Sequence, residues 1–195
     1  MGSLEVLQQG ARQATGEKLD YTFYDTIPLS TGVRDYRFFA LALGQGSPTP
    51  KNKSQTNMRA NGQIPQGHNH QVQEIWFDYT AEQVQNEAAL LAYYQFLNTS
   101  TVTFAMPGKD DFGVWKLSEI AGAHVKFPIT PAVAGDNSPV LSNEVYSSRF
   151  KLSIPVTLPA LESFEIKLEL FADPNAALVG DTVGFGLRGH LIRLG

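Results

Sequence analysis

Alternating apolar and polar positions form the strongest pattern in this chain, and residues 163–171 show it most clearly. In a β-strand, successive side chains point to opposite faces of the sheet, so this alternation predicts one buried face and one face in water. The predicted inner residues are Phe164, Ile166, Leu168 and Leu170, and the predicted outer residues are Glu165, Lys167 and Glu169. The segment is therefore expected to be a half-buried strand.

A second alternating segment, at residues 70–79, follows a polar and turn-forming stretch at 56–69. Its period of two again predicts a strand. One face is expected to carry Ile75, Phe77 and Tyr79. The other face is expected to carry Val72, Glu74, Trp76 and Asp78.

Further strands are predicted where β-branched and aromatic residues gather between turn residues. They span residues 21–27, 33–43, 100–105, 113–127, 146–158 and 182–194.

One helix is predicted, at residues 82–97. Thr80 can cap its start, and Gln83 three residues later completes the pattern of a capping box. Apolar residues then recur at spacings of three and four, which predicts one apolar stripe along the helix. The stripe comprises Val84, Ala88, Leu90, Leu91, Tyr94 and Leu97. We expect this helix to lie over the sheet between two strands.

Polar segments separate these elements. Residues 1–20 are expected to form an extended N-terminal arm before a single domain at 21–195. Residues 44–61 and 128–144 are rich in Gly, Pro and Asn and are predicted to be long loops. Eight strands with long connections favour an all-β fold, a single eight-stranded jelly-roll sandwich with one helix in an inter-strand loop.

The composition narrows the classes of function. Of the 195 residues, 43% are hydrophobic and 17% are charged, and the net charge of −4 disfavours a nucleic-acid groove. The absence of cysteine excludes disulfides, thiolate metal sites and Cys nucleophiles. Neither a Gly-x-Ser-x-Gly motif nor a Walker-type loop is present. We therefore expect no enzyme, no small-molecule substrate and no sequence-specific nucleic-acid binding.

One cluster of ligand-like residues qualifies that expectation. It consists of His68, His70 and Glu74, preceded by Gly62. Two imidazoles and a carboxylate can bind Fe(II), Mn(II), Zn or Ni and leave coordination positions open for a substrate. The spacing resembles the first motif of the cupins, a jelly-roll family, and this resemblance implies a metal-dependent enzyme as an alternative function.

The resemblance to cupins is confined to residues 62–74. Ala81 stands where that family has a glycine, and the family's second motif is found around neither His124 nor His190. Polar residues that enter a strand at the rim of a sheet explain the cluster more simply. No metal and no other cofactor is therefore expected.

A wider resemblance involves three segments of the chain, at residues 56–65, 164–170 and 184–194. Together with the helix-bearing connection, they resemble the jelly-roll coat proteins of tailless icosahedral bacteriophages. The resemblance implies a structural capsid protein that is made in the host cytoplasm and resides in the virion. Its implied partners are copies of itself and other capsid proteins, and an internal viral membrane stays open as a further partner.

The resemblance also implies that arms and loops supply the contacts between copies. The low charge fraction agrees with this, because large protein–protein interfaces are depleted of charged residues. We expect residues 1–20, 44–67 and 128–144 to make the main contacts between subunits.

A carbohydrate-binding jelly roll is a third alternative. Such a module would expose aromatic side chains on a concave face, and Trp76 and Trp115 are the candidates.

Overall fold

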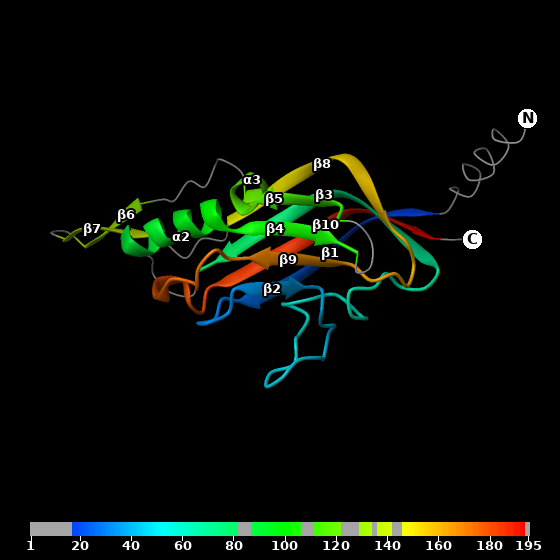
Figure 1. Cartoon of the computed structure of the whole chain (residues 1–195), viewed down its shortest axis with the longest axis horizontal. Coiled ribbons are helices and arrows are strands. Elements are labelled where there is room, and N and C mark those ends of the chain that lie inside the picture. The colour runs from blue at the N-terminus through cyan, green and yellow to red at the C-terminus, as the bar shows by residue number, and fades with distance from the viewer. Residues whose placement is uncertain are drawn as a thin grey trace, which may run out of the picture.

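The structure, a computed structural model, describes residues 17–81, 87–106, 111–121, 129–133, 136–141 and 146–193. Two antiparallel four-stranded sheets dominate these residues and lie one on the other (Figure 1). The long sheet has the order β1 (Lys18–Pro28), β10 (Thr182–Arg193), β3 (His68–Thr80) and β8 (Tyr146–Leu158). The short sheet has the order β2 (Asp35–Phe38), β9 (Glu165–Glu169), β4 (Thr101–Ala105) and β5 (Gly113–Lys116). The all-β expectation is confirmed.

The pairing of these eight strands is nested along the chain. The first strand, β1, pairs with the last, β10, and the second, β2, pairs with the next to last, β9. In the same way, β3 pairs with β8, and β4 pairs with β5. The eight strands are thus paired as in one long hairpin, and successive pairs belong alternately to the long sheet and to the short sheet.

Aromatic side chains fill the space between the sheets. The ring of Phe185 on β10 lies 4.8 Å from that of Phe38 on β2 and 5.5 Å from that of Phe77 on β3. All three residues are buried. Burial of one such ring contributes roughly 2 kcal/mol, so contacts of this kind hold the two sheets together.

The alternation predicted for residues 163–171 is confirmed on its inner face, where Phe164, Ile166, Leu168 and Leu170 are buried. On the outer face, the prediction for Glu165 is wrong, because only 9% of this residue is exposed. Its carboxylate lies 3.3 Å from Lys167 and 3.8 Å from Arg37 of the neighbouring strand. These long side chains cover the carboxylate and compensate its charge.

A β-bulge changes the faces predicted for β3. Ile75, Phe77 and Tyr79 are buried, as expected, but Val72 is buried on the same side, which the simple alternation did not predict. The pairing of β3 with both neighbouring strands shifts register between Val72 and Glu74. The extra residue reverses the alternation: even-numbered side chains point to the core before the bulge, and odd-numbered side chains point to the core after it.

The glycine at position 189 makes this bulge sterically feasible. A Cβ atom on Gly189 would lie 1.9 Å from the carbonyl oxygen of Gln71. On the other side of β3, the residues from Leu152 to Pro155 of β8 stand opposite the bulge. Ile154, one of these unpaired residues, is 79% exposed.

Helix α2 (Glu87–Thr99) confirms the predicted helix, of which residues 82–86 lie outside the described part of the chain. Its orientation differs from the prediction. The buried residues are Ala89, Ala92, Tyr93, Phe96 and Leu97. Leu91 and Tyr94, which were expected on the buried stripe, are 59% and 41% exposed. The helix is apolar on more than one side, and the packing selects a side that periodicity alone did not identify.

Three other local predictions need correction. Within the strand predicted at 113–127, the structure shows β5 followed by a short helix, α3 (Leu117–Ala121), whose apolar side chains pack into the core, while residues 122–127 lie outside the described part of the chain. The strand predicted at 33–43 ends at Phe38, because Phe39 has a φ of 68° and turns the chain. The loop predicted at 128–144 contains a hairpin instead.

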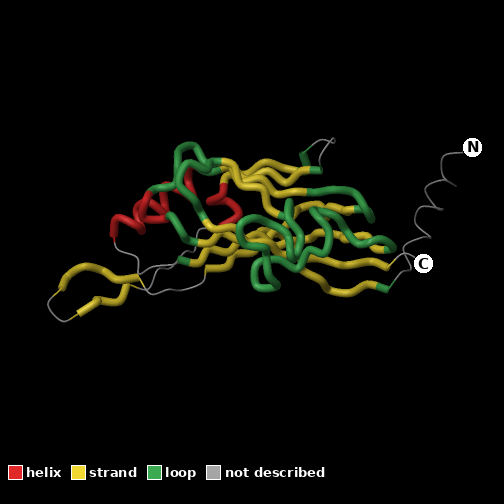
Figure 2. The backbone as a smooth tube through the Cα atoms, turned by 90° about the horizontal axis from the view of Figure 1, so that it is seen from below, coloured by secondary structure: helices red, strands yellow, loops and turns green. Residues whose placement is uncertain are grey.

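That hairpin consists of β6 (Ile129–Val133) and β7 (Asp136–Leu141) and extends from the end of the molecule that carries α2 (Figure 2). The 3-10 helix η1 (Ala176–Leu178) lies near α2 at the same end.

The loop predicted at 44–61 is confirmed, and it covers part of the free edge of β1. The amide of Thr26 donates to the carbonyl of Gln55 at 2.8 Å, and the Asn57 carboxamide accepts from the amide of Tyr24 at 2.9 Å. Lys51 reaches the buried carboxylate of Asp25 at 2.5 Å. The loop therefore satisfies backbone groups that an edge strand would otherwise leave open.

Most of the predicted N-terminal arm, residues 1–16, lies outside the described residues. Its last part belongs to the long sheet, because β1 begins at Lys18, opposite Ile192 of β10. No helix among the described residues is long and apolar enough to span a membrane.

Candidate functional site

The structure places the three residues of the candidate metal cluster in different surroundings. His70 is buried between the sheets, where its Nε2 donates to the carbonyl of Leu187 at 3.1 Å. Glu74 lies on the outer face of the long sheet, 3.5 Å from Arg188. His68 lies half-buried at the rim, where its Nδ1 donates to the carbonyl of Gln66 at 3.2 Å.

The bulge in β3 is the reason for this separation. In a regular strand, residues four positions apart, such as His70 and Glu74, point to the same face of the sheet. Because of the bulge, these two residues lie on opposite faces. Within the described ranges, no three His, Cys, Asp or Glu side chains are grouped to hold a metal ion. His124 lies outside those ranges, and His190 is paired with Asp20 at 3.0 Å.

Burial dominates the electrostatics of His70. Because the folded protein surrounds the ring with apolar groups, such as Phe23 at 5.0 Å between ring centroids, burial lowers the pKa of His70 to about 4. The ring is therefore neutral near pH 7, and it acts as a hydrogen-bonded core residue.

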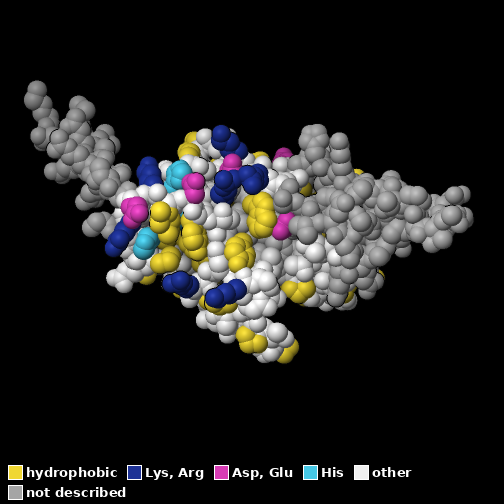
Figure 3. All heavy atoms as spheres, turned by 180° about the vertical axis from the view of Figure 1, so that it is seen from behind, with side chains coloured by type: hydrophobic (Ala, Val, Ile, Leu, Met, Phe, Trp, Pro, Cys, Tyr) yellow, Lys and Arg dark blue, Asp and Glu magenta, His cyan; other side chains and the backbone are white. Residues whose placement is uncertain are grey.

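The two tryptophans do not form a shared binding face. Trp115 is partly buried and packs against Phe150, with ring centroids 5.4 Å apart. Trp76 lies on the outer face of the long sheet over Gly186, where a Cβ atom would come within 2.7 Å of the indole. Side chains of both charges are interspersed on that side of the molecule (Figure 3).

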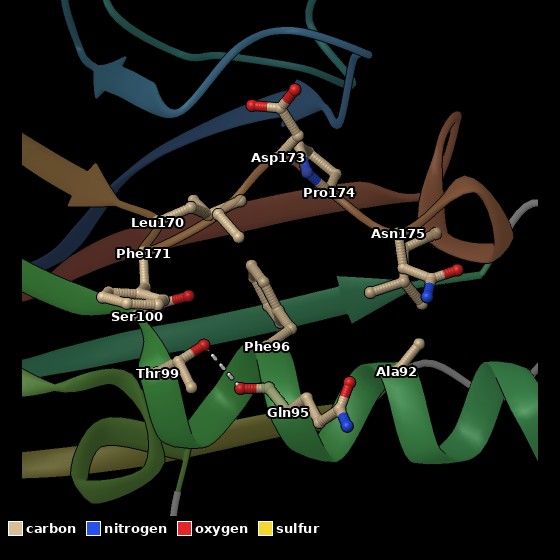
Figure 4. Close-up of a pocket in the computed structure, with 12 residues that line it drawn as sticks. Ala92, Gln95, Phe96, Thr99, Ser100, Leu170, Phe171, Asp173, Pro174 and Asn175 are labelled. Carbon is tan, nitrogen blue, oxygen red and sulfur yellow. Dashed lines mark hydrogen bonds between the residues drawn. The ribbon is translucent and has the colours of Figure 1, made fainter.

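A pocket with a volume of about 440 Å³ lies between α2 and the segment that leads from β9 to η1. Its apolar lining includes Phe96, Leu170 and Phe171, and Figure 4 shows Phe96 pointing from α2 towards that segment. Phe171 is 83% exposed at the rim. A protruding aromatic ring thus stands directly beside an apolar hollow.

Polar groups line the same pocket sparsely. Gln95 and Asn175 provide carboxamides, and the Oγ of Ser100 is buried without a hydrogen-bond partner among the described residues. Asp173 is compensated by Arg34 at 2.5 Å, so the rim carries no uncompensated charge of its own.

The outward side of α2 extends this apolar region. Leu91 is exposed one helical turn before Gln95, which lines the pocket, and Tyr94 is exposed beside it. We call Leu91, Tyr94, Phe171 and the adjoining pocket the α2 patch. A helix that is apolar on several sides is usually covered on all of them, and this property of residues 88–97 is the signal in the sequence that could have indicated an exposed apolar patch on α2.

Comparisons of the chain with protein-family models and with curated proteins found no match.

Proposed function

We propose that this chain is a structural virion protein, a jelly-roll subunit that assembles with copies of itself and with other capsid proteins into an icosahedral shell. The α2 patch is the observation that carries the proposal, because it presents an apolar surface that association would cover. The virion is the corresponding location.

The nested strand pairing supports the jelly-roll part of the proposal. A jelly roll is a hairpin of eight strands that is wrapped into two sheets, and the pairs β1–β10, β2–β9, β3–β8 and β4–β5 follow that scheme. In this interpretation β6 and β7 are an insertion between the fifth and sixth strands of the roll. Viral coat proteins, lectins and cupins all use this architecture, so the fold alone does not distinguish among them.

The chemistry of the surfaces favours a coat protein over the other two. A cupin-type site requires convergent metal ligands, whereas His70 and Glu74 face opposite sides of the long sheet. A sugar platform made of the two tryptophans requires both rings to be exposed on one face, whereas Trp115 packs against Phe150. The α2 patch has features that are typical of protein–protein interfaces: a protruding aromatic ring, an apolar hollow and a few neutral polar groups.

A second copy of the chain is the partner that fits this patch best. Phe171 and the hollow beside it lie in one surface, so two copies related by a twofold axis could each insert Phe171 into the other's pocket. Such self-complementarity is the requirement for an isologous contact. The compensated Asp173–Arg34 pair at the rim leaves no repulsive charge to oppose it.

Light scattering on the purified protein tests the proposal. We expect multimers or closed particles, and we expect Phe171→Glu to reduce their mass, because a carboxylate would have to be buried in an apolar pocket. Ile154→Glu is the matched control, since Ile154 is similarly exposed but lies outside the α2 patch. Circular dichroism should show that both variants keep the β fold.

Two outcomes would contradict the proposal. A protein that stays monomeric at all concentrations, with or without other capsid proteins, would remove the assembly function. Equal effects of Phe171→Glu and Ile154→Glu would show that the α2 patch has no special part in association.

A further inference from the structure

The polar stretch that precedes β3 helps to form a second pocket, at the opposite end of the long sheet from α2. The pocket has a volume of about 230 Å³. Residues 57–68 line one side of it, and the beginning of β1 and the end of β10 line the other. None of its lining residues is acidic.

The floor of this pocket is apolar. Phe23 is 4% exposed and contacts the ring of Tyr21, with centroids 4.8 Å apart. Leu191 of β10 is partly buried and packs against the core beside them. An apolar group of a ligand would therefore lose water on entry and make contact with carbon atoms.

The cationic group at this pocket is the guanidinium of Arg59. Among the residues that the structure describes, no acidic group or carbonyl forms an ion pair or hydrogen bond with its side chain. An arginine can donate two parallel hydrogen bonds to one carboxylate, which makes it well suited to bind such a group.

Two neighbouring side chains, those of Tyr21 and His68, have hydrogen-bonding capacity left. The hydroxyl oxygen of Tyr21 accepts from Nδ2 of Asn57 at 3.4 Å, and the same Nδ2 donates to the carbonyl of Thr22 at 2.8 Å. Because that hydroxyl oxygen is an acceptor here, its hydrogen is available to a ligand. His68 uses Nδ1 to donate to Gln66, so Nε2 is the acceptor of the neutral ring.

We propose that this pocket binds a small organic carboxylate with an apolar body. The carboxylate lies against Arg59 and accepts from the Tyr21 hydroxyl, while the apolar body covers Phe23 and Leu191. One guanidinium matches the single charge of a carboxylate better than the double charge of a phosphate monoester. The site is independent of the α2 patch and adds a ligand to a chain whose sequence predicts none.

A matched pair of probes tests the charge requirement. Phenylacetate and phenylacetamide have nearly the same shape, and only the first is an anion. In NMR titrations we expect phenylacetate to shift the backbone amide signals of Asn57, Arg59 and His68, with a Kd on the order of 1 mM for a ligand of this size. Phenylacetamide should bind about tenfold more weakly.

Two variants locate the effect. Arg59→Gln should weaken phenylacetate binding about tenfold while leaving phenylacetamide binding unchanged. Arg149→Gln removes the same charge from an exposed position on β8 that does not line the pocket, so it should leave both probes unaffected. Unaltered spectra outside the pocket would show that each variant is folded.

The proposal is overturned if acid and amide bind equally, if Arg59→Gln and Arg149→Gln have the same effect, or if the shifted signals lie elsewhere. None of these results would bear on self-association through the α2 patch, which is measured by particle mass.

Discussion

The imidazole of His70 lies where a positive charge is strongly disfavoured. It is fully buried, and burial lowers its pKa to about 4 from an ordinary value of 6.5. Between about pH 4 and pH 6.5, the unfolded chain therefore binds a proton on this residue that the folded chain does not. By linkage, the stability contributed by the neutral ring is present above pH 6.5 and is lost as the pH falls towards 4.

Replacement of His70 by Gln should remove this pH dependence, because the amide can still donate to the Leu187 carbonyl but does not titrate. We expect the free energy of unfolding of the wild type, relative to His70→Gln, to fall by about 3 kcal/mol between pH 6.5 and pH 4. Urea unfolding at a series of pH values measures it. Burial also raises the pKa of Asp78 to about 6, which has the opposite sign, so only the difference between the two proteins is informative.

In that experiment, His68→Gln serves as the control, since His68 lies at the half-buried rim. A His70→Gln protein with the same pH profile as the wild type would show that the ring of His70 is not buried in the neutral form.

The carboxylate of Asp25 is another buried ionisable group, and its charge is compensated by one partner. It is fully buried, accepts from the amide of Phe39 at 2.7 Å and pairs with Lys51. Burial raises the pKa of Asp25, and Lys51 opposes that rise. Lys51 belongs to the loop at residues 44–61, so this ion pair holds that loop against β1, and the stability of the core depends on the loop staying in place.

Lys51→Met should cost about 3 kcal/mol near pH 7, because it leaves a buried carboxylate without its counter-ion. The pKa of Asp25 should then rise further, so the loss should diminish as the pH falls and the carboxyl takes up a proton. The double variant Asp25→Asn with Lys51→Met should recover part of the loss at pH 7. Thermal unfolding of the wild type and of these two variants measures this, and equal losses in the single and double variants would contradict it.

At the scale of elements, the bulge in β3 controls which side chains reach the core. Val72 and His70 lie inward before it, and Ile75 lies inward after it. The bulge depends on the close approach of two backbones at Gly189 and Gln71.

Gly189→Ala should therefore destabilise the fold severely, by roughly 3 kcal/mol or more, since the new Cβ would overlap a backbone carbonyl that cannot rotate away. Gly184→Ala, in the same strand, is the matched control: its Cβ would approach the methyl group of Thr26 at 2.9 Å, and that side chain can move. Chemical unfolding of both variants gives the comparison. Equal stabilities would show that the bulge tolerates a side chain.

The difference between what the sequence predicted and what it did not follows from the range of the interactions. The strand at 163–171 was predicted correctly on its inner face, because a local alternation suffices to define a buried side. The position of the bulge in β3 was not predicted, since it depends on contacts with β8 and β10, which are distant in sequence. As a result, His70 and Glu74, which the alternative cupin-like interpretation would bring together, face opposite sides of the strand, while the strand itself is confirmed.

The helix illustrates the same limit. Its existence and approximate position follow from local spacing, but its apolar residues cover more than one side. Which side is buried depends on the sheet beneath it, so Leu91 and Tyr94 were assigned to the wrong face. The pocket beside Phe171 could not be predicted from local pattern at all, because its walls come from α2 and from the segment after β9.

For the molecule as a whole, the balance of charge and apolar surface sets the conditions for association. Copies with a net charge of −4 repel one another, and salt screens that repulsion. The α2 patch, by contrast, is apolar, so a contact made through it would be strengthened by sulfate. We expect the mass of the assemblies to be maintained or to increase when NaCl is raised from about 0.05 M to about 0.5 M. Dissociation by salt, seen in sedimentation, would indicate a contact based on ion pairs instead.

The nested pairing of the strands has a consequence for the order of synthesis. Strand β1 ends at Pro28, whereas its partner β10 begins at Thr182, so roughly 150 residues must be translated between them. At about 5–20 residues per second, the ribosome needs on the order of ten to thirty seconds for that interval. The long sheet cannot close during this time, and the newly made first strand must wait for the end of the chain with its apolar face uncovered.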